Sequence, residues 1–221
     1  MNMTRNKLIV VVGPTAVGKT KVAIDLARLY ACEIISADSR QFYREMNIGT
    51  AKPTDEELSM ANHHFVNNLS IHDSYSAGKF ETEALNKLNE LFLTNDKAVL
   101  VGGSGLFINA LCIGLDDIPD VTPELREKLN QELLDNGLTH IQDRVKSIDP
   151  DFFEKVDINN KHRLLRCLEV FETNGKQLSK IQGQEKKPRP FDIQFVGLDM
   201  DRADLYDRIN KRVDIMMENG L

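Results

Sequence analysis

Short apolar runs alternate with segments of helical periodicity along most of this 221-residue chain. Short apolar runs predict strands over residues 7–12, 32–37, 98–101 and 193–198, and the runs over 7–12 and 98–101 are typical of buried parallel strands. Apolar residues at helical spacing predict helices over residues 19–30, 77–95, 106–111 and 201–219. Repeated alternation of strand and helix is typical of an α/β fold, with a parallel sheet flanked by helices.

Residues 116–190 depart from this alternation and contain no convincing strand. Thr122 followed by Pro123 is a helix start signal, and Asn136-Gly137 is a helix end signal. Further helices are predicted over residues 138–147 and 159–173. The pattern therefore predicts a small helical lobe, residues 116–190, inserted into an α/β core formed by residues 1–115 and 191–221.

Residues 42–76 are rich in loop signals, with a short helical stretch before the adjacent His63 and His64. Adjacent side chains point in different directions on a helix or a strand, and no third ligand stands at zinc spacing. The two histidines are therefore predicted to pack or to form hydrogen bonds rather than to share a metal.

The composition is that of an ordinary globular protein, with 41% hydrophobic and 28% charged residues. Three widely separated cysteines without C-x-x-C spacing indicate neither disulfides nor a zinc site, so we expect a cytoplasmic protein with reduced thiols. No apolar run is long enough for a membrane span, and none forms a secretory signal. The net charge of −6 means that a nucleic-acid partner would need a local basic face. The chain is expected to be a monomer.

The sequence GPTAVGKT lies between the first predicted strand and the first predicted helix. It fits the P-loop pattern G-x-x-x-x-G-K-[ST], in which backbone N–H groups and a lysine bind phosphates and the final hydroxyl ligates Mg²⁺. A glycine-rich turn would explain the glycines but not the Lys-Thr pair. We therefore predict a P-loop NTPase-like core that binds a diphosphate or triphosphate, with a nucleotide such as ATP as the default ligand. The predicted phosphate-binding residues are Gly13, Pro14, Thr15, Ala16, Val17, Gly18, Lys19 and Thr20, with Thr20 as the Mg²⁺ ligand.

Polar residues also follow two other predicted strands. Asp38-Ser39-Arg40-Gln41 comes after residues 32–37, and Gly102-Gly103-Ser104-Gly105 comes after residues 98–101. Open α/β sheets bind their ligands at the carboxyl ends of the strands, so both segments could face the phosphates. A capped turn and a tightly packed turn explain them equally well. The strand over residues 98–101 lacks the terminal Asp that usually holds Mg²⁺ in P-loop ATPases, which argues against plain ATP hydrolysis.

Two groups of basic residues allow more than one interpretation. Arg163 and Arg166 share a helical face near Lys161 and His162, and a further basic stretch follows them. This group could bind a polyanion or form a solvated, salt-bridged surface. Arg208 and Arg212 could clamp phosphates or pair with Asp204 and Asp207. The residues of the basic stretch are Lys176, Lys180, Lys186, Lys187 and Arg189.

Five sequence blocks, in order, resemble the tRNA dimethylallyltransferases of the bacterial type. The blocks are GPTAVGKT, ISADSRQFY with MNIGTAKP, VGGSGLF, NNKHRLLRCLEV with TNG, and DRINKRV-x-x-MM-x-x-GL. The resemblance implies a prenyltransferase that moves the dimethylallyl group of dimethylallyl diphosphate to the exocyclic N6 amine of the adenosine adjacent to the anticodon of tRNA. It also implies that the P-loop holds the diphosphate that is released.

The resemblance assigns roles to individual residues. It implies that Asp38 is the general base for the adenine amine, and that Lys19 and Ser104 also lie at the reacting centre. Arg208 or Arg212 would stabilise the diphosphate together with Mg²⁺. Phe107 stands where the family usually has Tyr, so any role of that phenol is lost here. The implied tRNA-binding residues are Asp38, Ser39, Arg40, Gln41, Ser104, Arg126, His162, Arg163, Leu164, Leu165 and Arg166.

Family members continue beyond the MM-x-x-GL block with further helices, whereas this sequence stops at Leu221. We therefore expect that part of the family's tRNA-binding structure is not represented in this chain. Two other functions share the same motifs. An ATP-dependent small-molecule P-loop kinase would use Asp38 toward a hydroxyl, and a non-catalytic module would bind nucleotide or tRNA without group transfer.

Overall fold

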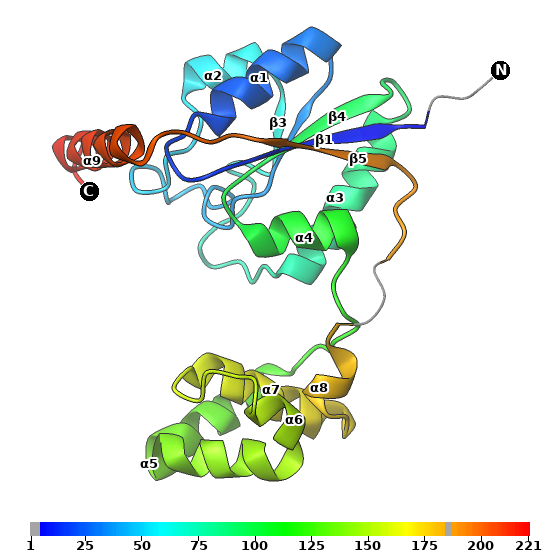
Figure 1. Cartoon of the computed structure of the whole chain (residues 1–221), viewed down its shortest axis with the longest axis vertical. Coiled ribbons are helices and arrows are strands. Elements are labelled where there is room, and N and C mark those ends of the chain that lie inside the picture. Colours follow the sequence, from blue (N-terminus) through cyan, green and yellow to red (C-terminus); the bar gives the residue numbers. More distant parts are fainter. Residues whose placement is uncertain (1–4, 184–186) are drawn as a thin grey trace. The chain divides into compact units, whose positions relative to one another are not determined.

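The computed structural model describes residues 5–183 and 187–221 of the chain. It contains two compact units, which are Met1–Gly114 with Lys187–Leu221, and Leu115–Lys186. We call them the core unit and the helical unit (Figure 1). Within the described residues, no helix combines the length and the hydropathy that a membrane span requires.

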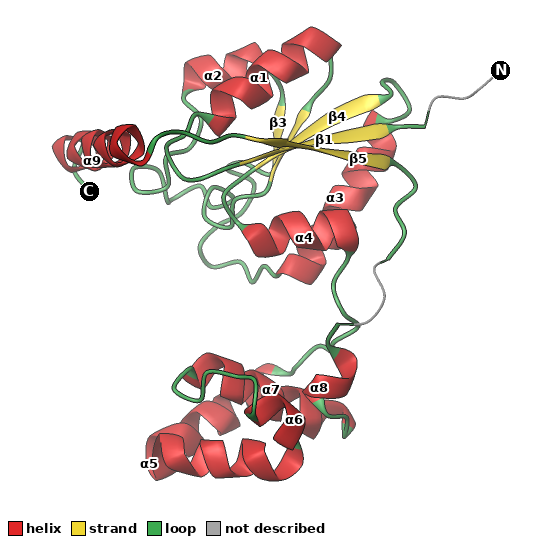
Figure 2. Ribbon diagram, in the orientation of Figure 1, coloured by secondary structure: helices red, strands yellow, loops and turns green. Residues whose placement is uncertain are grey.

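The core unit is built on a five-stranded sheet with the strand order β3-β2-β4-β1-β5 (Figure 2). Every pair of neighbouring strands is parallel, which confirms the predicted α/β fold. The strands are β1 Lys7–Val12, β2 Ile34–Ser36, β3 His63–His64, β4 Lys97–Val101 and β5 Asp192–Gly197. The helices of this unit are α1 Lys19–Tyr30, α2 Asp55–Met60, α3 Ala77–Leu91, α4 Gly105–Ile113 and α9 Arg202–Glu218.

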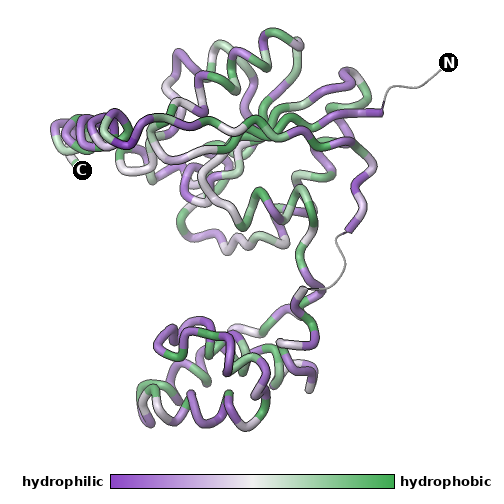
Figure 3. Tube along the Cα trace, in the orientation of Figure 1, coloured by the Kyte–Doolittle hydropathy of each residue, from purple (hydrophilic) through white to green (hydrophobic). Residues whose placement is uncertain are grey.

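Hydrophobic side chains of the central strands are buried on both faces of the sheet. The hydrophobic colouring at the centre of the core unit in Figure 3 marks this part of the chain. In β1, Ile9 and Val11 belong to the cluster that contains α1 residues, while Leu8 and Val10 pack with residues of α3 and α4. This alternation is the two-residue period of a strand. Apolar runs without polar interruptions result because helices cover both faces.

The strand β3 was not predicted, because two adjacent histidines carry no hydrophobic signal. Its residues extend the sheet by pairing His63 with Ile34 and His64 with Ile35. His64 Nε2 lies 2.6 Å from Glu33 Oε2, and His63 Nδ1 lies 2.8 Å from the Ala61 carbonyl oxygen. Backbone pairing and side-chain hydrogen bonds thus hold both histidines at the edge of the sheet.

The helical unit contains α5 Pro123–Ile148, α6 Pro150–Phe153, α7 Lys161–Asn174 and α8 Leu178–Ile181 around its own apolar core. The Thr122 hydroxyl caps α5 by accepting the N–H of Leu125 at 3.3 Å. Gly137 interrupts the helix with φ 77° and ψ 174°, a conformation that is essentially restricted to glycine. The predicted end of a helix at Gly137 therefore corresponds to a sharp kink within α5.

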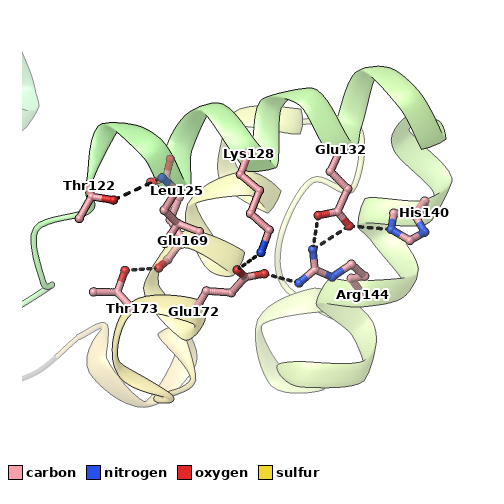
Figure 4. Close-up of polar contacts among 9 residues, drawn as sticks. All are labelled: Thr122, Leu125, Lys128, Glu132, His140, Arg144, Glu169, Glu172 and Thr173. Atoms are coloured by element: carbon pink, nitrogen blue, oxygen red, sulfur yellow. Dashed lines mark hydrogen bonds and ion pairs between the residues drawn. The ribbon is translucent and has the colours of Figure 1, made fainter.

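Charged residues join the two halves of α5 to α7 (Figure 4). Glu132, before the kink, accepts hydrogen bonds from Arg144 at 2.6 Å and pairs with His140 at 2.7 Å. Arg144 also pairs with Glu172 of α7, which binds Lys128 at 3.3 Å. Arg144 therefore lies between two carboxylates and connects segments that are distant in sequence.

The boundaries between the units differ from the predicted ones, mainly where the chain returns from the helical unit to the core unit. Residues 187–190 were assigned to the lobe by sequence, but the structure ties them to the core unit. The Lys187 N–H donates to the Ile113 carbonyl at 3.0 Å, and the Arg189 guanidinium binds the Ala110 and Leu111 carbonyls at 2.6 and 2.9 Å. Arg189 also pairs with Glu81 at 2.7 Å, and both side chains are nearly buried. Lys186 lies outside the described residues.

Gly102 lies where the chain leaves β4 and passes close to the end of β2. A Cβ atom at this position would stand 2.2 Å from the Ala37 carbonyl oxygen and 2.4 Å from its carbon. The contact is reinforced on both sides, since Ala37 N–H donates to Val101 and Ser104 N–H donates to Ala37. Only a residue without a side chain fits between these two backbones.

Gly102→Ala is expected to lower the free energy of unfolding by about 1–3 kcal/mol, because the methyl group must push two hydrogen-bonded backbones apart. Gly105→Ala is the matched control, since a Cβ atom there meets nothing within 4 Å. The measurement is urea unfolding of both variants and the parent protein. Equal stability of the two variants would contradict the tight contact at Gly102.

Candidate active site

A cavity of about 650 Å³ opens at the carboxyl edge of the sheet in the core unit. The segments that follow β1, β2 and β4 all contribute to it, as expected for an open α/β sheet. Its lining includes most of the predicted site residues of this unit. These are Gly13, Pro14, Thr15, Ala16, Gly18, Lys19, Thr20, Asp38, Ser39, Arg40, Gln41, Ser104 and Arg212.

The P-loop forms one wall of the cavity and leads directly into α1. Gly18 precedes the helix and provides no side-chain cap. The first N–H groups of a helix carry partial positive charge and bind anions well. Lys19 Nζ donates to the carbonyl oxygens of Gly13 and Pro14 at 2.9 and 2.8 Å. The wall therefore presents backbone donors and one ammonium group.

Cations lie close together at this wall. Burial lowers the pKa of Lys19, and the positive charge of Arg212 lowers it further, whereas the negative charge of Asp38 opposes the shift. Desolvation and repulsion between like charges both disfavour the charged ammonium. A bound polyanion would relieve this repulsion, so the electrostatics suit a phosphate ligand.

Asp38 lies on the facing segment, where hydrogen bonds hold its neighbours in place. The Arg40 N–H donates to Asp38 Oδ1 at 3.0 Å, while Oδ2 has no donor among residues 5–183 and 187–221. Ser104 Oγ accepts the Ser39 N–H at 2.9 Å and donates to Ser39 Oγ at 3.0 Å. Ser104 thus links the segments after β2 and β4, and one oxygen of Asp38 stays available for a ligand.

Gln41 lines the cavity, but its amide is occupied by the protein itself. Its Nε2 donates to the Thr50 and Ala51 carbonyls at 3.1 and 3.0 Å, and Ser36 Oγ lies 3.5 Å from its Oε1. Lys52 supports the same loop through the Tyr43 carbonyl at 2.6 Å. In this arrangement Gln41 holds the wall of the cavity, and its amide could donate to a base only if one of these two Nε2 bonds broke.

The structure separates the two arginines of α9. Arg212 lines the cavity, whereas Arg208 Nη1 donates to the Val17 carbonyl at 3.3 Å and supports the P-loop from outside. Val17 is buried and does not line the cavity, so its side chain is a packing residue. In the described ranges, neither arginine forms an ion pair with Asp204 or Asp207.

Sequence reasoning missed several lining residues. Thr50, Pro53, Glu57 and His63 reach the cavity from the loop after Phe42, from α2 and from β3. Burial lowers the pKa of His63, and its Nε2 is buried without a hydrogen-bond partner in the part of the chain that the structure describes. Thr50 and Pro53 lie in the MNIGTAKP block, which pointed to part of this wall. Glu57 and His63 do not directly follow a predicted strand, so no sequence pattern placed them at the site.

In the helical unit, the predicted tRNA-binding residues lie on α5 and at the start of α7. His162, Arg163 and Arg126 are exposed. Leu164 and Leu165 are buried in the apolar core, so their side chains cannot contact RNA without unfolding the helix. They belong to the same buried cluster as Cys167 and Leu168 of this helix.

The basic stretch after α7 does not form one free basic surface. Lys180 pairs with Asp151 at 2.6 Å, and Arg189 is the buried partner of Glu81. The side chain of Lys187 packs beside Gly114. Salt bridges therefore account for the charges of Lys180 and Arg189.

The metal-ligand set is small. Thr20 lines the cavity at the start of α1 together with Lys19. Among the residues that the structure describes, no group of three or more His, Cys, Asp or Glu side chains could hold a metal ion. Mg²⁺ that binds together with phosphates needs only one or two protein ligands, so the Thr20 hydroxyl fits that mode of binding.

A protein-family model described as IPP transferase matches residues 41–221. The chain is 50% identical over 216 residues to a tRNA dimethylallyltransferase of Christiangramia forsetii, covering 98% of this chain and 72% of the relative. A tRNA dimethylallyltransferase of Flavobacterium psychrophilum is 46% identical over 222 residues, with coverage of 98% and 72%.

Solved structures agree with these relatives. A tRNA isopentenylpyrophosphate transferase of Bacillus halodurans matches with a TM-score of 0.63 and 37% identity, covering 98% of this chain and 67% of that one. A eukaryotic dimethylallyltransferase acting on tRNA matches with a TM-score of 0.80 and 29% identity, covering 97% and 54%. These matches confirm the resemblance drawn from the five sequence blocks. The chain therefore belongs to the IPP transferase family, the family of the tRNA dimethylallyltransferases.

Proposed function

We propose that the protein transfers a dimethylallyl group from dimethylallyl diphosphate to the exocyclic N6 amine of the adenosine adjacent to the anticodon in tRNA, with release of diphosphate. One observation carries this proposal. A single cavity holds a P-loop with two nearby cations on one side and the Asp38 carboxylate on the other. A diphosphate leaving group and a nucleophile that must lose a proton need these two features together.

The P-loop and Arg212 are proposed to bind the diphosphate. As the bond between the allylic carbon and the diphosphate oxygen breaks, negative charge grows on the leaving group. Lys19, Arg212 and the N–H groups at the start of α1 face that charge. Arg208 acts indirectly, since its bond to the Val17 carbonyl holds the loop in shape.

Mg²⁺ is proposed to bind with the diphosphate, held on the protein side by the Thr20 hydroxyl. When bound, the ion supplies positive charge that stabilises the departing diphosphate. All other interactions with the diphosphate come from the protein groups described above.

Asp38 is proposed to be the general base. The adenine nitrogen forms a bond to the allylic carbon while the bond from that carbon to diphosphate breaks, and Asp38 Oδ2 takes the proton that the amine loses. Oδ2 suits this role because no donor within the described residues occupies it. The target base must leave the anticodon stack to reach this cavity.

Ser104 and Ser39 are proposed to position the acceptor side. Ser39 Oγ accepts the Ser104 hydrogen, so it keeps its own hydrogen for another acceptor. Arg40 is exposed at the same wall and can approach the RNA backbone.

The helical unit is proposed to contact tRNA phosphates through His162, Arg163, Arg126 and Arg166. We further propose that the protein acts in the cytoplasm as a monomer.

Asp38→Asn is expected to lower kcat for prenyl transfer by about 10²- to 10⁴-fold, because the amide cannot accept the proton. The KM for dimethylallyl diphosphate should change little. The measurement is transfer of labelled dimethylallyl to tRNA with Mg²⁺, with ATP as the control donor. Robust ATP consumption without label in tRNA would contradict the proposed function and favour a kinase.

Arg212→Gln is expected to weaken inhibition by inorganic diphosphate by about tenfold or more, the effect of one charge-assisted contact. Arg208→Gln removes the same charge one helical turn away and should weaken inhibition less, because Arg208 does not line the cavity. Comparing the two inhibition constants tests the assignment. A larger effect at Arg208 would reverse it.

The pKa of Lys19 is lowered below the ordinary lysine value of about 10.4. Diphosphate affinity is therefore expected to fall as the pH rises through this lowered pKa. The bound anion favours the charged ammonium and raises its pKa, so binding takes up a proton in this range. Inhibition constants for inorganic diphosphate between about pH 7 and 10 measure the effect. Lys19→Arg is the control because it stays charged, while the titration of the diphosphate itself is unchanged. Parallel pH profiles for both proteins would exclude Lys19 as the titrating group.

A further inference from the structure

Glu169 is a buried carboxylate of α7 in the helical unit. The residue is only 7% exposed, and its neighbours in the sequence, Leu168 and Val170, belong to that unit's apolar core. A buried carboxylate requires charged or hydrogen-bonding partners. Its two partners are Arg126 and Arg166, both of which belong to the residues proposed to bind tRNA.

Each carboxylate oxygen of Glu169 binds a different arginine. Arg126 Nε of α5 lies 3.2 Å from Oε1, and Arg166 Nη1, three residues earlier on α7, lies 2.9 Å from Oε2. The guanidinium-bearing side chains are 57% and 38% exposed, in contrast to the buried acid. A single carboxylate therefore holds two guanidinium groups at the surface.

The arrangement leaves a net positive charge and spare donors. One carboxylate compensates one of two guanidinium charges. The terminal nitrogens of Arg126, and Nε and Nη2 of Arg166, have no hydrogen-bond partner within residues 5–183 and 187–221. Guanidinium groups offer a planar fork of donors that matches the oxygens of a phosphate.

The neighbouring network around Arg144 differs in its ratio of acidic to basic residues. Glu172, one helical turn further along α7, binds Lys128 and Arg144, and Arg144 also binds Glu132 (Figure 4). Arg144 thus lies between two carboxylates and is less exposed than Arg126 or Arg166. This second network is suited to joining helices, whereas the Glu169 network keeps surplus charge at the surface.

We propose that Glu169 is a positioning residue for tRNA binding, which fixes Arg126 and Arg166 as a preformed pair for the phosphate backbone of the RNA. The inference rests on the proposed function, because it assigns these arginines to tRNA. A long arginine side chain loses conformational freedom when it is immobilised, and two guanidinium groups side by side repel each other. Glu169 offsets both costs before the RNA binds, as preorganisation requires.

Glu169→Gln distinguishes a positioning role of Glu169 from a simple effect of its charge. The two roles predict changes of opposite direction in the affinity for tRNA. Removal of one negative charge from an RNA-binding surface should strengthen binding if charge alone matters. If Glu169 positions the arginines, the KM and Kd for tRNA should instead rise by about tenfold, with kcat at saturating tRNA unchanged.

Glu172→Gln is the matched control, since it makes the same charge change on the same helix. It disturbs the network of Arg144 and Lys128, which lacks the surplus charge. Its KM for tRNA should equal or fall below that of the parent protein. Thermal unfolding measures the stability of both variants. If both lose the same stability, that loss cannot explain a rise in the KM for tRNA that only Glu169→Gln shows.

A mutant cycle tests whether Glu169 acts through the two arginines. In an Arg126→Gln/Arg166→Gln background, Glu169→Gln should cause no further increase in the Kd for tRNA. A merely structural role would weaken binding equally in both backgrounds. If Glu169→Gln does not fold, Glu169→Asp keeps the charge, withdraws the carboxylate from the arginines and should raise the Kd as well.

The outcomes separate this inference from the proposed function. If the parent protein transfers no dimethylallyl group to tRNA, the proposed function fails before Glu169 is tested. If the parent protein transfers the group but the folded Glu169→Gln or Glu169→Asp variant binds tRNA as tightly as the parent or more tightly, the positioning role is overturned. An equal rise in Kd in both arginine backgrounds overturns it as well.

Discussion

The site depends on the close approach of two backbones, at Ala37 after β2 and Gly102 after β4. A side chain on Gly102 would overlap the Ala37 carbonyl, and the hydrogen bonds from Ala37 to Val101 and from Ser104 to Ala37 keep the two segments in contact. Because Asp38 follows Ala37 directly, this contact determines where the carboxylate stands relative to the P-loop. The bonds between Ser104 and Ser39 extend the same connection to the next residue. A rigid junction of two strands thus positions the Asp38 carboxylate, which a mobile loop could not do as well.

The opposite wall of the cavity is organised by electrostatic repulsion. Burial lowers the pKa of Lys19, and the nearby positive charge of Arg212 lowers it further. Such an arrangement costs stability in the free protein and is relieved when an anion binds, so it favours an anionic ligand over a neutral one. Arg208 instead donates a hydrogen bond to the carbonyl of Val17 and holds the shape of the loop. Two arginines one helical turn apart therefore serve one site in distinct ways.

The helical unit repeats this division between support and binding. Arg144 lies between Glu132 and Glu172 and joins both halves of the kinked α5 to α7 (Figure 4). Glu169, by contrast, is buried beneath two arginines whose charges it only partly compensates. Both networks combine glutamates and basic residues of the same two helices. The ratio of acids to bases, together with exposure, distinguishes a structural network from a surface that can still attract phosphates.

Periodicity and motif spacing are properties of neighbouring residues, and they sufficed to predict four of the five described strands, the P-loop, the inserted helical segment and the family. Which of the predicted residues face the cavity depends instead on contacts between distant segments. Arg208 bonds to a residue 191 positions away, Arg126 finds Glu169 at a separation of 43, and Gln41 is taken up by the Thr50 and Ala51 carbonyls. Leu164 and Leu165 share a motif with exposed arginines but lie in the core. The strand at His63 exists because β2 offers an edge to pair with, not because of its own residues. Such partners depend on packing between distant segments, and no local pattern encodes them.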